Sequence, residues 1–180
     1  MTNQLLSDAS ALFMLWIFSQ AGLHKIKAEN NHYYRSLIAD YFNLATSSQT
    51  RLKPLVKLVG MIEITLGLAI IINASREIAA IGAAIILLGY FSIMAYQLYQ
   101  GKRDMDCGCG GPAGQLKISK HLLIRNLLFI VIALSCVLPG QPSLTWLSLI
   151  SFGLAISAIL LNLIIEQLIA NAQKLALFRT

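Results

Sequence analysis

Two cysteines separated by one glycine, Cys107-Gly108-Cys109, are the residues of this sequence best suited to chemistry. Their thiols can join in a disulfide, although residues two apart lie near the upper limit of normal Cα spacing for one. Gly108 lacks a Cβ and can adopt the backbone angles that such a small ring requires. A strained bridge is easily reduced, as catalytic and regulatory disulfides are. The spacing therefore indicates a redox-active dithiol, with Cys107 and Cys109 as its catalytic residues.

Basic residues surround this pair in the sequence and would stabilise a thiolate, although Asp104 and Asp106 oppose the effect. The basic residues are Lys102, Arg103, Lys117, Lys120 and Arg125.

Two other interpretations of the cysteine pair stay open. The cysteines could bind zinc or copper(I) with His121, but paired zinc-binding cysteines are usually two to four residues apart and no fourth ligand is evident. Alternatively, they are unpaired thiols in a glycine-rich loop.

Glu63 is the second notable residue, because it lies near the middle of an apolar run. An ionisable group inside a membrane is costly, and by default it faces the bundle interior or a wet cavity. We expect Lys25, Arg125 or Asn126 as its partner. Glu63 is then either a proton-accepting or helix-orienting group, or a protonated carboxyl that is hydrogen-bonded to a neighbouring helix.

Arg125 and Asn126 lie one turn into an apolar segment that follows the cysteines. From there they could reach back toward the cysteine loop and support the site. The alternative for Arg125 is snorkelling, in which its charged end extends to the lipid headgroups. Cys136 lies about ten residues further along the same segment, so we expect a buried structural thiol that does not meet the pair.

The composition indicates that membrane-spanning helices must position these residues. The chain has 180 residues, of which 57% are hydrophobic and 12% charged, and its mean hydropathy is +0.68; soluble domains carry about 25% charged residues. Crossing a bilayer takes about 20 apolar residues in a helix. Five segments fit, or four if one lies flat: Leu5–Leu23, Leu55–Ile72, Ile78–Leu98, Leu122–Leu138 and Leu144–Ile165. We therefore predict an all-α, polytopic bundle of four to five transmembrane helices.

Residues 1–180 are expected to form one integral membrane domain. Residues 28–50 have an apolar face at helical spacing and predict an interfacial amphipathic segment, and residues 101–120 form the cysteine loop.

The distribution of basic residues predicts the orientation in the membrane. With five spans, Arg76 is the only one of the 14 basic residues on the amino-terminal side. The positive-inside rule then places the amino terminus in the periplasm and the cysteine loop in the cytoplasm. The net charge of +6 is accounted for by lipid and topology, so we expect no nucleic-acid partner.

Three segments of the chain resemble the MauE family of methylamine utilization proteins, within a wider group of DoxX-like, redox-associated membrane proteins. The specific segment is Asp106-Cys-Gly-Cys-Gly-Gly, followed by Ile118-Ser119 and by Leu123-Ile-Arg-Asn-Leu-Leu128. The segments Phe18 to Lys25 and Tyr33 to Leu44 also fit. Gly111 departs from the pattern, which would have an aromatic residue there.

The resemblance implies a role in maturing the small subunit of methylamine dehydrogenase, an exported, disulfide-rich protein with a tryptophan-derived quinone. It also implies a thioredoxin-like, membrane-anchored partner (MauD-like), location in the bacterial inner membrane, and thiol exchange at Cys107 and Cys109. A role in maturing an exported subunit favours cysteines on the periplasmic side of the membrane, whereas the count of basic residues places them on the cytoplasmic side.

A thiol-disulfide oxidoreductase is thus the first hypothesis for the function. The alternatives are a small-solute or proton-coupled transporter that uses Glu63 and a non-catalytic assembly subunit. No cofactor is evident; a quinone stays open as a cofactor, although no residue pattern supports one.

Overall fold

The computed structural model describes residues 2–42, 52–102, 105–108, 116–138 and 146–177. Within these ranges every regular element is a helix, apart from an isolated antiparallel β-bridge between Asp106 and Lys117. The helices are α1 (Thr2–Ile26), η1 (Ala28–Asn30), α2 (Asn31–Phe42), α3 (Leu52–Ile71), α4 (Arg76–Tyr99), α5 (Lys120–Ser135) and α6 (Trp146–Leu177). The all-α prediction is confirmed.

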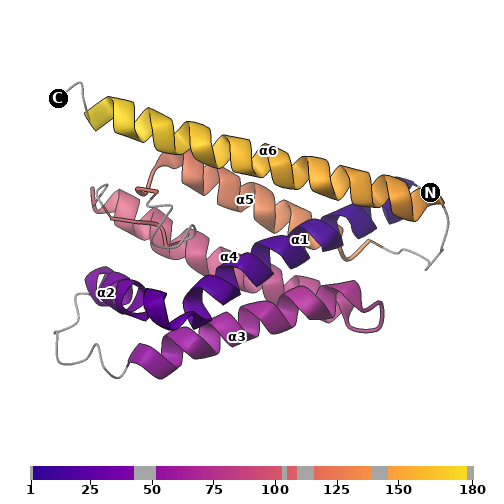
Figure 1. The fold of residues 1–180 in the computed structure, drawn as a ribbon, viewed down its shortest axis with the longest axis horizontal. Coiled ribbons are helices and arrows are strands. Elements are labelled where there is room, and N and C mark those ends of the chain that lie inside the picture. The colour runs from indigo at the N-terminus through magenta and orange to yellow at the C-terminus, as the bar shows by residue number, and fades with distance from the viewer. Residues whose placement is uncertain (1, 43–51, 103–104, 109–115, 139–145, 178–180) are drawn as a thin grey trace.

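Four of these helices are long and apolar enough to cross a membrane: α1 from Asn3, α3, α4, and the Ser148–Leu175 part of α6. The prediction of a polytopic bundle with four to five spanning helices is therefore confirmed. α5 has 16 residues, fewer than the roughly 20 that cross a bilayer, although it runs along the bundle beside α4 (Figure 1). α6 has 32 residues and continues well past Ile165, where the sequence predicted its end.

The long helices run back and forth along one axis, so the chain has two distinct ends (Figure 1). The amino terminus, the turn from α3 to α4 and the start of α6 lie at one end. α2, the end of α4, the start of α5 and the end of α6 lie at the other, which we call the α2 end. The described part of the cysteine loop connects α4 to α5 and thus belongs to the α2 end.

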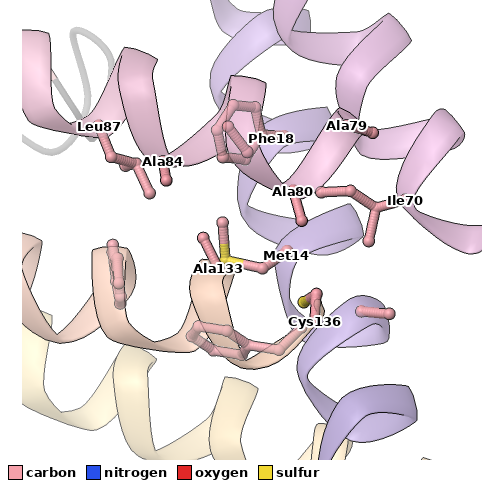
Figure 2. Close-up of a cluster of buried hydrophobic side chains, with 13 residues drawn as sticks. Met14, Phe18, Ile70, Ala79, Ala80, Ala84, Leu87, Ala133 and Cys136 are labelled. Atoms are coloured by element: carbon pink, nitrogen blue, oxygen red, sulfur yellow. The ribbon is translucent and has the colours of Figure 1, made fainter. Parts of the chain in front are cut away.

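A buried apolar cluster joins α1, α3, α4 and α5 (Figure 2). Small side chains on α4 let neighbouring helices approach closely; they are Ala79, Ala80, Ala83 and Ala84. Cys136 belongs to this cluster and is 1% exposed, with its Sγ 3.5 Å from the carbonyl oxygen of Ile132. Because it follows the last residue of α5, Cys136 lies at the opposite end of that helix from the cysteine loop. It is a buried thiol, as expected.

Two glycines bring α1 and α3 into backbone contact. A Cβ added to Gly22 would lie 2.6 Å from the carbonyl oxygen of Gly60, and one added to Gly60 would lie 2.9 Å from that of Gly22. Neither position can hold a larger residue without moving the helices apart. Lys25 and Glu63 each follow one of these glycines by three residues, so the close crossing brings their turns together.

Candidate functional site

Two short segments, residues 105–108 and 116–118, pair in antiparallel fashion at the α2 end, and we call these paired segments the hairpin. Cys107 lies on the first of them. Its backbone N–H donates to the carbonyl oxygen of Leu116 at 2.9 Å, and the N–H of Ile118 donates to Met105 at the same distance. Leu116 and Ile118 are buried and fix the hairpin to the bundle. The Cys107 side chain is half-buried. Cys109 lies outside the described residues, so the Cys107–Cys109 pair stays a prediction.

Gly108 has the backbone conformation that favours glycine, with φ of +72°. A Cβ at this position would lie 2.5 Å from Cδ2 of Leu37, so the turn is also packed tightly against α2. The left-handed φ and the contact are two separate reasons for glycine here. Glycine at position 108 therefore allows both the backbone conformation of the loop and its close packing against α2.

Tyrosines of α2 hold the hairpin by its acidic residue. The Tyr41 hydroxyl donates to the backbone oxygen of Asp106, and the Tyr33 hydroxyl donates to the Asp106 carboxylate at 3.4 Å. The Gln97 side-chain amide of α4 donates to the carbonyl oxygen of Tyr41 at 3.0 Å. Burial, and next the negative charges of Asp106 and Cys107, raise the pKa of Tyr33 above its ordinary value. Its hydroxyl therefore stays protonated and able to donate at working pH.

Gln173 of α6 holds the second arm of the hairpin. Its side-chain oxygen accepts from the backbone N–H of Lys117 at 3.0 Å, and its side-chain nitrogen donates to the Lys117 carbonyl oxygen at 2.8 Å. The amide thus satisfies both backbone groups of one residue, as a neighbouring strand would. Hydrogen bonds from α2 therefore hold the first arm of the hairpin, and hydrogen bonds with α6 hold the second.

Glu63 lies in a closed polar network between α1, α3 and α4. The Lys25 ammonium lies 2.8 Å from both of its carboxylate oxygens, and the Tyr90 hydroxyl donates to one of them. The side chains of Lys25 and Glu63 are 12% and 2% exposed. The ammonium also lies over the rings of Tyr34 and Tyr90, at 5.7 and 5.3 Å from their centroids. Lys25, rather than Arg125 or Asn126, is the partner that the structure places beside Glu63.

Arg125 is buried in the bundle rather than extended to its surface, at 7% exposure. Its guanidinium forms an ion pair with Glu166 of α6 and lies 5.4 Å from the ring centroid of Phe129. This arrangement contradicts the snorkelling alternative. Asn126 donates to the carbonyl oxygen of Leu87 at 3.2 Å, so it ties α5 to α4.

One cavity of about 360 Å³ brings these groups together. Its wall includes five of the six residues that the sequence proposed for the site, namely Cys107, Gly108, Glu63, Arg125 and Asn126; the sixth, Cys109, lies outside the described residues. Lys25, Tyr90 and Glu166 line it as well. The remaining wall is mostly apolar. The volume falls in the range of small-molecule sites, roughly 300–1,000 Å³.

The part of the chain that the structure describes contains no group of three His, Cys, Asp or Glu side chains placed to hold a metal ion. His121 is exposed on the first turn of α5. Because Cys109 is outside this part, the metal-binding and dithiol interpretations of the loop both stay predictions.

Sequence reasoning missed Glu166 and Gln173. Glu166 was placed just beyond a span that ended at Ile165, yet an acidic residue inside a continuing apolar helix is the same signal that singled out Glu63. Gln173 gave no comparable signal, because a glutamine near the end of a helix is usually solvated.

Comparison with known proteins assigns the family. A family model described as methylamine utilisation protein MauE matches residues 3–139. The methylamine utilization protein MauE of Paracoccus denitrificans is 25% identical over 135 residues, which cover 75% of this chain and 69% of that protein. No solved structure matches. The family match spans α1 to α5 and the cysteine loop, which hold most of the cavity wall, and on this evidence the chain belongs to the MauE family of methylamine utilisation proteins.

Proposed function

We propose that this protein is a membrane thiol-disulfide redox protein that supports maturation of an exported protein. The methylamine dehydrogenase small subunit, or a similar disulfide-containing subunit, is the substrate. A thioredoxin-like, membrane-anchored protein (MauD-like) is the redox partner. Membership of a methylamine utilisation family is consistent with this role.

The placement of Cys107 is the observation that carries the proposal. Its hairpin is held by α2 and α6, and its side chain lines a cavity between apolar helices. Two ion pairs, Lys25 with Glu63 and Arg125 with Glu166, line the same wall. A half-buried thiol that is held in place at a cavity reacts selectively, with the partners that can reach it.

The proposed chemistry is exchange between two dithiol-disulfide pairs. The thiolate of one cysteine attacks the partner's disulfide, forms a mixed disulfide and releases one partner thiolate. The second cysteine of the pair then attacks the mixed disulfide. This step forms the Cys107–Cys109 bond and releases the fully reduced partner, so two electrons pass to the partner. The reverse direction uses the same steps.

The orientation is also part of the proposal. We place η1 and α2 at the membrane interface; α2 and the end of α6 share one end of the bundle (Figure 1), to which the cysteine hairpin also belongs. Residues 43–50 of the predicted amphipathic segment lie outside the described residues. Among the residues that the structure describes, the basic residues other than Arg76 belong to that end or to the helix segments leading to it. We place it on the cytoplasmic side of the bacterial inner membrane, with the amino terminus in the periplasm.

The test combines trapping and sidedness. Cys107→Ser and Cys109→Ser should each abolish maturation of the target subunit, while Cys136→Ser, a matched change at a buried thiol, should not. One of the two loop variants should accumulate a mixed disulfide with the thioredoxin-like partner, detected by non-reducing electrophoresis. Labelling Cys107 with an impermeant maleimide in intact and in opened cells reports its side. Normal maturation in both loop variants would remove the redox role.

The two alternatives make different predictions in the same assay. A transporter built around Glu63 would lose activity in Glu63 variants that fold normally and would tolerate both loop variants. An assembly subunit without chemistry would tolerate serine at positions 107 and 109 and fail only when the protein is absent. The bidentate contact of Glu63 with Lys25 favours a fixed structural pair, so the redox proposal stands first.

A further inference from the structure

Arg125 has a buried hydrogen-bond donor that the described residues do not satisfy. Its Nη1 pairs with Glu166, but its Nε–H has no partner among the described residues. The residue is 7% exposed and lines the cavity. Buried charged donors are nearly always hydrogen-bonded, so an unpartnered one on a cavity wall points to an acceptor supplied by a bound molecule.

The charges on the wall limit what that molecule can be. Lys25 is paired with Glu63, and Arg125 with Glu166. Each cation is thus neutralised by an adjacent carboxylate. An anionic ligand would face both carboxylates without an unpaired cation to offset them. A neutral acceptor oxygen meets no such repulsion, because it needs only a donor.

The apolar residues of the cavity wall indicate that the rest of the ligand is apolar. Phe18, Leu87, Met94 and Phe129 are buried apolar residues that line the cavity. The cavity lies between helices whose length and composition suit a membrane. An apolar molecule dissolved in the bilayer matches this lining, since burial of its apolar surface favours binding.

We infer that the cavity binds a neutral, lipid-soluble molecule that presents a carbonyl oxygen to the Nε–H of Arg125. Two sources supply this chemistry in a membrane, a quinone ring and the ester of an acyl lipid. The inference concerns binding and does not rest on the proposed thiol exchange. Loss of exchange in the cysteine variants would therefore leave it untouched.

The test uses the full chain in nanodiscs and three photoreactive probes. The probes are a decyl-substituted azidobenzoquinone, a diazirine-bearing fatty acid methyl ester and a diazirine-bearing alkane of similar length. Unlabelled decylubiquinone or methyl ester competes, and mass spectrometry maps the labelled residues. We expect saturable, competed labelling near Arg125 with the quinone or with the ester, and none with the alkane, which lacks an acceptor. The probe that is competed at lower concentration identifies the source.

Arg125→Lys tests the contact itself, because lysine keeps the charge opposite Glu166 but has no Nε–H in that position. Labelling should require about tenfold more probe, the change expected for one charge-assisted hydrogen bond. Arg76→Lys is the matched control: Arg76 pairs with Asp8 and its Nε–H is satisfied by Ile70 at the other end of the bundle. It should leave labelling unchanged.

A second variant keeps the inference testable if Arg125→Lys folds poorly. Ala170 lines the cavity from α6, and Ala170→Leu should reduce labelling by filling space while Arg125 stays intact. Absence of saturable labelling by both carbonyl probes in the wild-type protein would overturn the inference. Equal weakening by Arg125→Lys and Arg76→Lys would overturn it too.

Discussion

The Lys25 ammonium lies 2.8 Å from both carboxylate oxygens of Glu63, whose side chain is 2% exposed. This contact depends on the glycine crossing of α1 and α3, which brings the two turns together. In a buried pair the attraction between the charges offsets a large desolvation cost, so loss of one partner leaves an uncompensated charge. The pair is therefore a stability element as well as part of the cavity wall.

Glu63→Gln should lower the free energy of unfolding by about 3–5 kcal/mol, because it leaves the Lys25 ammonium buried without its counter-charge. Unfolding of the protein in mixed micelles by increasing SDS measures the change. Asp8→Asn is the matched control, since the Asp8 side chain is 31% exposed and its pair with Arg76 should contribute less than about 1 kcal/mol. The double variant Lys25→Met, Glu63→Gln should regain part of the loss. Equal effects of the two single changes would contradict this account.

The sequence predicted the fold well because apolar length is a local property. Charge-free runs located the spanning helices, and the rarity of an acid inside such a run identified Glu63. The predicted span ended at Ile165, one residue before Glu166, because it had already reached bilayer length. α6 in fact continues to Leu177.

The contacts that hold the hairpin could not be predicted from the sequence. Tyr41, Gln97 and Gln173 are ordinary interfacial or solvent-facing residue types in a single sequence. Their role follows only from the packing of α2, α4 and α6 around Asp106 and Lys117. Residue types along the chain are enough to locate a membrane helix, whereas hydrogen bonds between distant segments depend on the tertiary structure.

Gly108→Ala should destabilise the hairpin for two reasons, an unfavourable φ and contact with Leu37. Gly101→Ala separates them, because Gly101 has a similar φ of +78° but nothing within 4 Å of an added Cβ. We expect a loss of about 1–2 kcal/mol at position 101 and a larger loss at position 108. Hydrogen exchange of the backbone amides of Cys107 and Ile118 reports the local opening.

A further substitution checks the Leu37 contact directly. Leu37→Ala removes the atom that an alanine Cβ at position 108 would meet, so the combined variant should lose less stability than the sum of the single changes. Strict additivity would show that the backbone conformation alone requires glycine.

Gln173→Ala should loosen the second arm of the hairpin, because both backbone groups of Lys117 lose their hydrogen bonds to Gln173. Each hydrogen bond contributes about 1 kcal/mol, so the hairpin amides should exchange roughly tenfold faster or more. Gln173→Glu keeps the acceptor for the Lys117 N–H but loses the donor, and its effect should be intermediate. Asn171→Ala, at an exposed amide on the same helix, is the control and should leave exchange unchanged.

The last prediction concerns the charge that Cys107 experiences from the Arg125–Glu166 pair, which lines the same cavity. A positive charge favours the thiolate and a negative charge opposes it. Arg125→Gln leaves the Glu166 carboxylate unbalanced, so alkylation of Cys107 at pH 7 should slow by about threefold or more. Glu166→Gln leaves the Arg125 guanidinium unbalanced, so the same reaction should become faster by a similar factor. At pH 10, where the thiol is already ionised, both variants should react at nearly the wild-type rate.

The opposite signs of these two changes separate an electrostatic effect from damage to the fold, which would act in one direction. The measurement uses a Cys109→Ser, Cys136→Ser background, so that Cys107 is the remaining one of the three cysteines, and follows maleimide modification from pH 6 to 10. Arg76→Gln and Asp8→Asn make the same two changes in the ion pair at the opposite end of the bundle, and neither should shift the profile. If Arg125→Gln and Glu166→Gln both slow the reaction, or if neither changes it at pH 7, the pair does not act on the thiol. Arg125 would then belong to the cavity without tuning Cys107.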